Sequence, residues 1–440
     1  MYQSYFDFVY NIFILFLLVF CFPIPVIGNS VYLAIFLALT KLLYQGKISK
    51  ILILLKCGYA CKLLVWTIAM VIFGAVFTII NCAFEFSRSF AIFSLLIGLI
   101  SVLIIYPSLS TSRGSKYVSY IEMEKLLVAI FIVQAIISIL SFISPNFKTL
   151  ISHFQFSDDA NLAEESYAGI RGLALSGRLY FEFAATCGLI VIFQIKRIVD
   201  EETVTNVSIL LLILLIICGF FAGRTALVGL GIGIGFLLLS SLPKRIKFKF
   251  VLRFILILIS CFSLILFLAP TDLRDFIFDH LLPWVFDVFI KLHETGSTED
   301  SVSFNGLNQM YENVVISGKE WIYGSGIYTE ESGRYYGHVD AGYLRQILYW
   351  GLAGTLISLI YTLKIFQLPW KVSKHNKNQR LFLLILLVYT LVVHYKGDLL
   401  SISRFYYVIL FLYFISMWQS YKQKNYMQPN HSLIHLSHVS

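Results

Sequence analysis

The sequence predicts an all-α, polytopic membrane protein, and three observations support this fold class. Hydrophobic residues make up 58% of the 440 positions, the mean hydropathy is +0.80, and only 13% of residues are charged, against roughly 25% in soluble domains. Apolar runs of about 20 residues, the length of a transmembrane helix, recur along the whole chain. They are continuously apolar rather than alternating, which favours helices over a membrane barrel. We therefore expect one integral membrane domain over residues 1–440.

About twelve transmembrane helices are expected. They lie near residues 6–22, 26–43, 59–80, 90–107, 126–143, 179–195, 207–222, 225–242, 250–269, 341–363, 381–398 and 402–419. The 36 residues from 207 to 242 carry one charge, at Arg224. As one helix they would extend ~54 Å, beyond a ~30 Å hydrocarbon core, so two spans with a turn near Gly223 fit better. The first span lacks the basic n-region of a signal peptide and is expected to be retained.

Basic residues gather in alternate connections between the predicted spans. These connections lie at 41–56, 113–125, 196–197, 244–253, 364–380 and 422–424. Positively charged loops stay in the cytoplasm, so both termini, including a tail at 421–440, are expected there. Connections 144–178 and 270–340 are then external, the second between spans nine and ten. It is expected to hold short helices, one of them an amphipathic helix at 271–292 broken at Pro283, lying at the membrane interface or on the bundle.

Lysine and arginine are distributed differently between the two sides. The cytoplasmic clusters contain 16 of the 21 lysines but only 5 of the 13 arginines. The other arginines lie in external connections or at external helix ends: Arg88, Arg171, Arg178, Arg224, Arg274, Arg334, Arg345 and Arg404. The planar fork of arginine matches phosphate oxygens in pairs, which predicts binding of an anionic head group. A nucleic-acid partner is not expected, because no soluble domain would carry the basic surface.

The first candidate site is "YAGIRGLALSGRLYFEFAA" (167–185). Arg171 and Arg178 precede a span and are predicted to clamp an anion at the outer surface. The alternative is that they anchor the helix end or pair with nearby acidic residues. Glu182 follows one turn inside the apolar run, where a carboxylate usually faces a cavity or a partner. It is expected to orient Arg178 or to touch substrate.

The second candidate is Arg224 in "FFAGRTALVGLGIGIG" (220–235). Arg224 has no acidic neighbour in sequence, so a ligand or a distant carboxylate must balance its charge. The following glycines, at 229, 231, 233 and 235, include the GxxxG spacing that lets helices approach closely. We interpret them as packing residues, because no strand precedes them as a nucleotide-binding loop requires.

The third candidate lies in "GRYYGHVDAGYLRQILYWGLAGTL" (333–356). His338 and Asp340 precede a predicted span and Arg345 lies inside it. The seven residues from His338 to Arg345 would span ~10 Å of helix, which suits a base at one end of a reacting group and an anion clamp at the other. Asp340 is equally a natural N-cap for a helix beginning at Ala341.

The fourth candidate is Arg404 in "VVHYKGDLLSISRFYY" (392–407), at the last external turn. Lys396 and Asp398 are expected to pair, which leaves Arg404 as the anion-binding residue. His338 and His394 form no metal motif, and no HExxH, acidic cluster or Walker loop occurs. No metal or other cofactor is therefore expected.

Four stretches follow one another as in a known group of enzymes. "HVDAGYLRQILYWGLAGTL" is similar to the pattern H-x-(N/D)-x-(G/E)-Y-L…G-L-x-G, and "VVISGKEWIYGSGI" (314–327) to a short helix before G-x-G. "RGLALSGRLYFEFAA" and "GRTALVGLGIG" are similar to an Arg-Gly segment and an (S/G)-R-(T/G)-A-L segment. Over roughly residues 160–360 the chain thus resembles the O-antigen polymerase and ligase superfamily. One departure is that Asn305 and Asn308 stand where relatives often carry an arginine.

The resemblance implies a metal-independent glycosyltransferase of the bacterial inner membrane with a GT-C-like helical fold. Such enzymes act at the periplasmic face on glycans linked to undecaprenyl diphosphate. A polymerase moves the growing chain onto the next lipid-linked repeat unit, with a chain-length regulator as a further partner. The features on which the family relies map onto Arg171, Arg178, Arg224 and His338.

These residues fit a hypothetical displacement reaction. His338 would take the proton of a sugar hydroxyl, and Asp340 would orient it. The arginines at 171, 178 and 224 would stabilise the departing diphosphate, while Arg345 holds the diphosphate of the acceptor. Direct displacement would invert the anomeric carbon.

Three other functions stay open. A ligase of the same superfamily would transfer the glycan to lipid A-core. A lipid-linked oligosaccharide flippase or other secondary transporter would also have about twelve spans, but the halves show no internal repeat and the charge lies at one face. A structural membrane protein would explain neither the arginine distribution nor His338.

Overall fold

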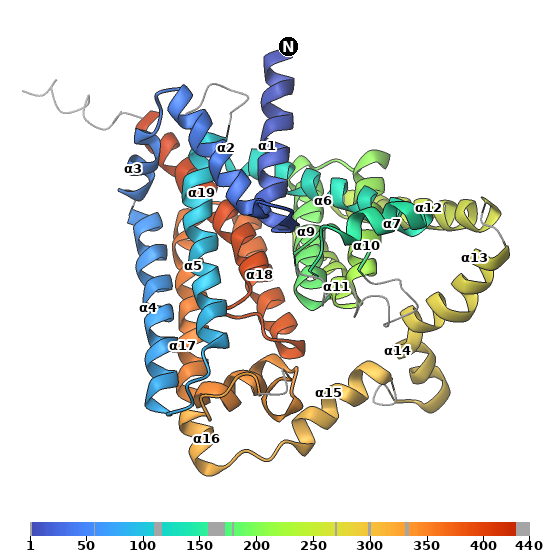
Figure 1. Ribbon diagram of the computed structural model, residues 1–440. Helices are drawn as coiled ribbons and strands as arrows, with labels where there is room; N and C mark the ends of the chain where they lie inside the picture. Colours follow the sequence, from blue (N-terminus) through green and yellow to red (C-terminus); the bar gives the residue numbers. More distant parts are fainter. Residues whose placement is uncertain are drawn as a thin grey trace, which may run out of the picture.

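The computed structural model is a bundle of long helices with an arc of shorter ones at its side (Figure 1). It describes residues 2–56, 58–109, 117–156, 172–177, 180–268, 271–297, 301–330 and 334–427. Every predicted span coincides with a helix. The twelve helices are α1 (Tyr2–Phe20), α2 (Ser30–Tyr44), α4 (Gly58–Ile80), α5 (Ser87–Ile105), α6 (Tyr120–Ile143), α9 (Phe181–Glu201), α10 (Asn206–Ala222), α11 (Thr225–Leu239), α12 (Lys244–Leu268), α17 (Gly342–Val372), α18 (Lys377–Lys396) and α19 (Arg404–Met427).

Short elements connect these helices. They are β1 (Pro23–Ile24), β2 (Gly28–Asn29), α3 (Ser49–Leu55), η1 (Tyr106–Ser108), α7 (Pro145–Ser152), α13 (Thr271–Phe276), η3 (Ile277–Leu281), α14 (Leu282–Thr295), α15 (Val302–Asn313), α16 (Gly318–Tyr323) and η4 (Tyr336–His338). The two strands form a small antiparallel hairpin that pairs Pro23 with Asn29.

Among the residues that the structure describes, five helices are long and apolar enough to cross a membrane. They are α4, α5 continued through η1, α6, α17 and α18. The pair α2 and α3, bent by 113°, would make a sixth. Helices α10 and α11 are apolar but have 17 and 15 residues, fewer than the ~20 that a crossing needs. The described part of the chain is therefore all-α, with five or six helices able to span a membrane by length and composition, and the count of twelve stays a prediction.

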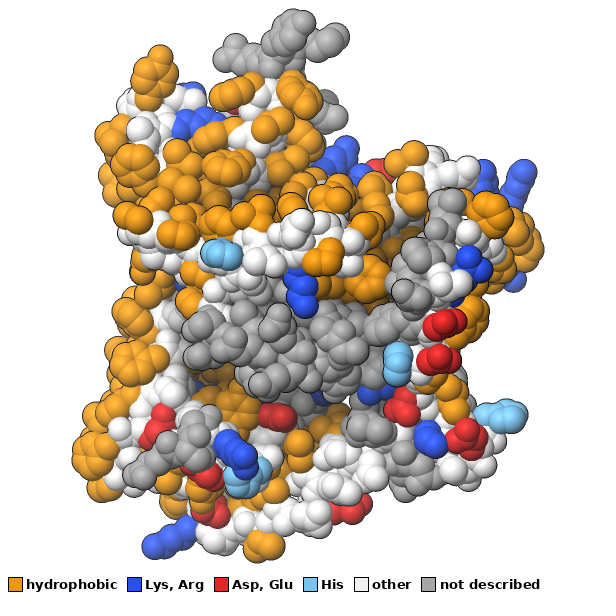
Figure 2. All heavy atoms as spheres, turned by 45° about the vertical axis from the view of Figure 1, so that its right-hand side comes forward, with side chains coloured by type: hydrophobic (Ala, Val, Ile, Leu, Met, Phe, Trp, Pro, Cys, Tyr) orange, Lys and Arg blue, Asp and Glu red, His pale blue; other side chains and the backbone are white. Residues whose placement is uncertain are grey.

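Most of the long helices form two adjoining groups (Figure 1). Helices α4, α5, α17, α18 and α19 stand together, and α6, α9, α10 and α11 pack beside them. The chain then leaves the bundle through α12 and returns along α13 to α16. Figure 2 shows hydrophobic side chains over much of the upper surface and left flank, with acidic side chains mostly below and basic ones both above and below. We call the helix ends joined by the predicted cytoplasmic connections the inner ends, and the opposite ends the outer ends.

Helix α19 runs through the centre of the bundle, and its residues from 405 to 417 are buried on all sides. Its tyrosine hydroxyls bond to neighbouring helices: Tyr406 with Thr390 at 2.8 Å and Tyr407 with Thr362 at 2.9 Å. Tyr413 accepts a 2.8 Å hydrogen bond from the side chain of Gln379. Such bonds matter within a bilayer, because no water is available to satisfy the hydroxyls.

Helices α9 and α11 pack closely at two glycines of α11. Of the four glycines predicted to serve packing, Gly229 and Gly233 do so. A Cβ at Gly229 would lie 2.4 Å from the Gly188 Cα, and one at Gly233 would lie 2.5 Å from the Ile195 Cδ1. These two glycines are the GxxxG pair that allows close approach. Gly231 and Gly235 have nothing within 4 Å and so do not take part.

Two local features differ from the sequence predictions, and a third agrees with them. The helix expected to break at Pro283 changes earlier, in the π-helical turn η3, and Pro283 lies in the first turn of α14, where its missing N–H costs no hydrogen bond. Lys196 was expected in a charged loop, yet α9 extends to Glu201. Its buried Nζ lies 2.7 Å from the equally buried Glu124 carboxylate on α6, because a buried charge requires a partner. The predicted turn at Gly223 is confirmed, since α10 ends at Ala222 and α11 begins at Thr225.

Candidate active site

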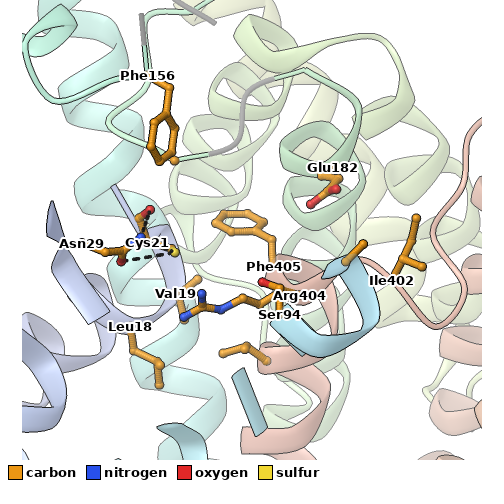
Figure 3. A pocket seen from close by; sticks show the side chains of 13 residues that line it. Leu18, Val19, Cys21, Asn29, Ser94, Phe156, Glu182, Ile402, Arg404 and Phe405 are labelled. Atoms are coloured by element: carbon orange, nitrogen blue, oxygen red, sulfur yellow. Dashed lines mark hydrogen bonds between the residues drawn. The ribbon is translucent and has the colours of Figure 1, made fainter. Parts of the chain in front are cut away.

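A cavity of about 430 Å³ opens among the outer ends of α1, α2, α5, α9 and α19. Its lining comprises Leu18, Val19, Cys21, Asn29, Ala91, Ser94, Phe156, Gly177, Glu182, Ile402, Arg404, Phe405 and Val408. The wall is mixed: apolar side chains surround one guanidinium and one carboxylate (Figure 3). This composition suits an amphipathic ligand with an anionic group.

Arg404 is the cation of this cavity and stands at the first residue of α19. Its side chain reaches across the pocket toward α1 (Figure 3). The Nε and Nη2 atoms are buried and have no hydrogen-bond partner among the described residues. Gly98 on α5 makes room for this side chain, because a Cβ there would lie 3.0 Å from the Arg404 Cγ. An anion entering the cavity would find two unused donors.

Glu182 belongs to the first turn of α9 and lines the same cavity. Its carboxylate accepts a 3.2 Å hydrogen bond from the Ser403 hydroxyl, next to Arg404 in the chain. The segment before α9 is fixed against α1, since the Gly177 N–H donates to the Phe20 carbonyl at 2.8 Å. A Cβ at Gly177 would lie 2.0 Å from the Cys21 carbonyl oxygen, so only glycine fits this approach.

A buried polar cluster adjoins the cavity along α5. Arg88, about two turns before Ser94, forms an ion pair with Asp398, and both side chains are 0% exposed. Asp398 also accepts hydrogen bonds from Gln346 at 3.0 Å and from the Tyr328 hydroxyl at 3.2 Å. Burial alone would raise the pKa of the Asp398 carboxyl, but the charge of Arg88, with smaller contributions from neighbouring groups, holds it below its ordinary value. The cluster ties α5, α17 and the loop before α17 together.

The cluster corrects the predicted pairing of Lys396 with Asp398, and it determines which ring nitrogen of His394 carries the proton. The expected partner of Asp398 was Lys396, whereas the structure pairs it with Arg88 on a distant helix. His394 accepts a 3.0 Å hydrogen bond at Nδ1 from the backbone N–H of Leu399, which fixes the proton of the neutral ring on Nε2. Its Nε2 is buried and has no hydrogen-bond partner among the described residues. His394 therefore supports the local fold rather than serving as an exposed base.

His338 and Asp340 both lie exposed at the outer mouth of α17. His338 has φ of 55°, and its N–H donates to the Tyr335 carbonyl at 2.9 Å. Helix α17 begins at Gly342 with Ala341 as its N-cap and no side-chain cap bond, so the predicted capping role of Asp340 is wrong. The reason is the left-handed turn at 337–338, which ends the helical geometry before Asp340. The expected helix from His338 to Arg345 is absent for the same reason.

The carboxyl of Asp340 is nevertheless perturbed. Partial desolvation by neighbouring atoms raises its pKa, and the positive charge of Arg345 opposes that rise. Its backbone N–H points at the Met310 sulfur of α15, 3.4 Å away. The Asp340 side chain itself is exposed at this mouth.

Arg345 is largely covered, with 7% exposure. Its guanidinium carbon lies 3.1 Å from the centre of the Tyr335 ring and 4.0 Å from that of Tyr328. A guanidinium stacked in this way is held mainly by the rings. The charge of Arg345 acts on Asp340 outside and on Asp398 inside, and its buried Nε has no hydrogen-bond partner among the described residues.

The G-x-G motif, Gly324 to Gly326, attaches the loop before α17 to that helix through backbone hydrogen bonds. Helix α17 is interrupted at Trp350 and Gly351, where Gly351 has φ of 66°. The N–H groups of Ser325 and Gly326 donate to the Leu348 and Tyr349 carbonyls at 2.7 and 2.8 Å. A Cβ at Gly351 would lie 2.1 Å from the Ile322 carbonyl oxygen, so the loop reaches the helix only because this residue is glycine.

The remaining predicted site residues lie elsewhere or outside the described residues. Arg224 pairs with Asp287 of α14, Nη1 to Oδ2 at 3.2 Å, so a distant carboxylate balances its charge. Arg171 and Arg178 lie outside the residues that the structure describes. Within the described part of the chain, Arg404 lies in the cavity and His338 with Asp340 at the mouth of α17, and no hydrogen bond or ion pair joins the two places.

No protein-family model, curated protein or solved structure matches this chain.

Proposed function

We propose that the protein is a membrane-embedded glycosyltransferase. It polymerises undecaprenyl-diphosphate-linked oligosaccharide repeat units into a surface polysaccharide, such as O-antigen, at the periplasmic face of the bacterial inner membrane. The observation that carries the proposal is the Arg404 guanidinium, which has two unused donors inside an apolar-walled cavity at the outer ends of the helices. A lipid diphosphate needs this combination of an anion site and an apolar wall.

The proposed reaction is a displacement at the anomeric carbon of the donor glycan. A hydroxyl oxygen of the acceptor glycan forms the new bond to that carbon, and the bond to the diphosphate oxygen breaks with inversion. The hydroxyl proton passes to a base, and the electron pair leaves with the diphosphate. A guanidinium placed beforehand beside the leaving group stabilises the charge that develops there.

We assign these roles to separate residues. Arg404 binds the departing diphosphate, with Arg171 and Arg178 as the expected additional cations. His338 is the proposed base, since neutral imidazole can accept a proton near pH 7 and this residue is exposed on the outer side. Asp340, two residues away and free of a capping role, assists His338. Arg224 is assigned to structure, because Asp287 already balances its charge.

Mutants in a polymerase-null host test this proposal. His338→Ala and Arg404→Ala, expressed to normal levels, are expected to leave single-repeat glycans where the wild type makes a full ladder. Arg404→Lys should restore little, because an ammonium lacks the paired donors. Arg274→Ala, on the exposed side of α13, is the matched control and should retain the ladder. A full ladder from both alanine mutants would refute the assignment.

A reconstituted reaction distinguishes the polymerase from its rivals. Purified protein receives lipid-linked repeat units without lipid A-core. Chain growth is expected for a polymerase, whereas product formed only after addition of core indicates a ligase. Movement of intact lipid-linked glycan across a vesicle membrane, without any bond formed, would indicate a transporter and overturn the proposal.

A further inference from the structure

A second hollow lies at the inner ends of α4 and α17, and it shares no lining residue with the cavity described above. It is small, about 60 Å³, and is open to the surface. Its lining consists of Tyr59, Lys62, Leu63, Trp66, Lys364, Gln367, Leu368 and Lys371. Three lysines and no acidic residue contribute to it, so the hollow is a concentrated positive site.

A proline on α17 fixes the geometry of this hollow. Pro369 has no N–H to donate to the carbonyl of Ile365 four residues earlier. The Tyr59 hydroxyl of α4 takes that place, at 2.8 Å from the Ile365 oxygen, and is itself buried. The two helices are thereby joined at the floor of the hollow, with Lys62 on one wall and Lys364 on the other.

The three lysines are not balanced within the described residues. Lys364 and Lys371 are seven residues apart and so share a face of α17, while Lys62 approaches from α4. No ion pair involves any of the three among the described residues. Lys364 lies 5.7 Å from the centre of the Trp66 ring, an arrangement that keeps an ammonium close to an aromatic face at the edge of an apolar helix.

The hollow continues into an apolar flank. On α4 the exposed side chains below it are Val65, Ile68, Ile72 and Val76, and on α17 they are Leu363, Ile360, Leu356 and Leu352. All eight of these side chains are exposed. A ligand in the hollow would contact the lysines at one end and the exposed apolar side chains of the flank at the other.

We propose that this hollow binds the head group of an anionic phospholipid. The phosphate lies among Lys62, Lys364 and Lys371, and the acyl chains follow the apolar flank of α4 and α17. Basic pockets between membrane helices on the cytoplasmic side commonly hold anionic head groups, and the predicted orientation places the hollow on that side. The site is independent of glycan transfer, so its success or failure says nothing about the proposed enzyme.

Native mass spectrometry of the purified full chain tests the proposal. The chain is released from nanodiscs containing phosphatidylglycerol and phosphatidylcholine in equal amounts. Wild type is expected to retain phosphatidylglycerol preferentially. Each lysine near a membrane surface contributes roughly a fivefold factor in affinity, so K62Q/K364Q/K371Q should weaken retention roughly a hundredfold. The single variant Lys364→Gln, expected to weaken it roughly fivefold, replaces the triple variant if the latter does not fold.

Two controls test whether the retained phosphatidylglycerol is bound in this hollow and whether the site selects a lipid over a free anion. K47Q/K244Q/K249Q removes three exposed inner-end lysines outside the hollow and should leave retention unchanged. Equal losses from both triple variants, or no loss from either, would overturn the site. Inorganic phosphate is added as a competitor that lacks acyl chains. Displacement of the lipid only at far higher concentrations of phosphate supports a phospholipid site, whereas equal competition would overturn it in favour of a free-anion site.

Discussion

The hydroxyl of Tyr59 on α4 lies 2.8 Å from the carbonyl oxygen of Ile365 on α17. That carbonyl is the one that Pro369 leaves without its helical donor. A residue 306 positions earlier in the chain thus completes the hydrogen bonding of α17. Pro369 and Tyr59 therefore form one structural unit, in which the tyrosine hydroxyl replaces the missing backbone N–H.

Tyr59→Phe should destabilise the protein through this lost bond. A buried carbonyl left without a donor costs about 1–3 kcal/mol. Pro369→Ala supplies a backbone N–H at the correct position, so the tyrosine change should cost much less in that background. Thermal unfolding of the four proteins of this double-mutant cycle measures the coupling. An equal loss in both backgrounds would show that the hydroxyl acts elsewhere.

Arg88→Met should be among the most damaging single changes at the outer end. It leaves Asp398 as a buried charge without its arginine, and breaking such a pair costs about 3–5 kcal/mol. R88M/D398N removes the stranded charge and should recover part of the loss. Lys291→Ala is the contrasting control, because its pair with Glu294 is exposed and is worth at most about 1 kcal/mol. Thermal midpoints in matched lipid give the comparison, and equal effects of R88M and K291A would contradict the buried pair.

Gly229→Ala and Gly231→Ala should act in opposite directions. A Cβ at Gly229 meets the α9 backbone at 2.4 Å, so the helices must separate at a cost of about 1–3 kcal/mol. Gly231 faces open space, and alanine there should gain up to about 1 kcal/mol of helix propensity. The two midpoints in one unfolding assay provide the check, and similar losses would mean that glycine packing does not set the α9–α11 distance.

The pH dependence of stability should carry the signature of Asp340. Its pKa in the folded protein is raised above the ordinary 3.8, so the folded state holds the proton more tightly than the unfolded chain. Stability relative to D340N should therefore be highest below pH ~3.8 and fall as the pH rises through the folded pKa. Unfolding of wild type and D340N across pH 3.5–7 measures this difference. A wild type that gains on D340N with rising pH would show that attraction to Arg345 outweighs desolvation.

The helices themselves were predictable, because an apolar run and its length are local properties. The turn at Gly223 followed from length alone, and the GxxxG spacing correctly identified Gly229 as a packing residue. The details that failed depend on distant neighbours. Lys196 can be buried because it forms an ion pair with Glu124 on another helix, and nothing in the sequence near Lys196 indicates that partner.

The sequence predicted that an arginine lies in the candidate site, but it did not predict which arginines are already paired with carboxylates. The excess of external arginines drew attention to Arg404, and that residue proves to have unused donors in a cavity. The same reasoning predicted that Arg224 binds an anionic ligand, but in the structure Asp287 balances its charge. The central position of Arg88 was missed because its partner lies far along the chain. Its signal was an arginine at the start of an apolar helix, where a charge requires a buried counter-charge.

The Arg88–Asp398 pair also sets an order of events during synthesis. The two residues are 310 positions apart, so at ~5–20 residues per second roughly 15 to 60 s pass between their appearances on the ribosome. Throughout that interval α5 carries a guanidinium whose carboxylate does not yet exist. Its outer end must wait at the water boundary while later helices insert. The bundle can close there only after the hairpin of α18 and α19 has been made, so the last fifth of the chain completes what the first fifth begins.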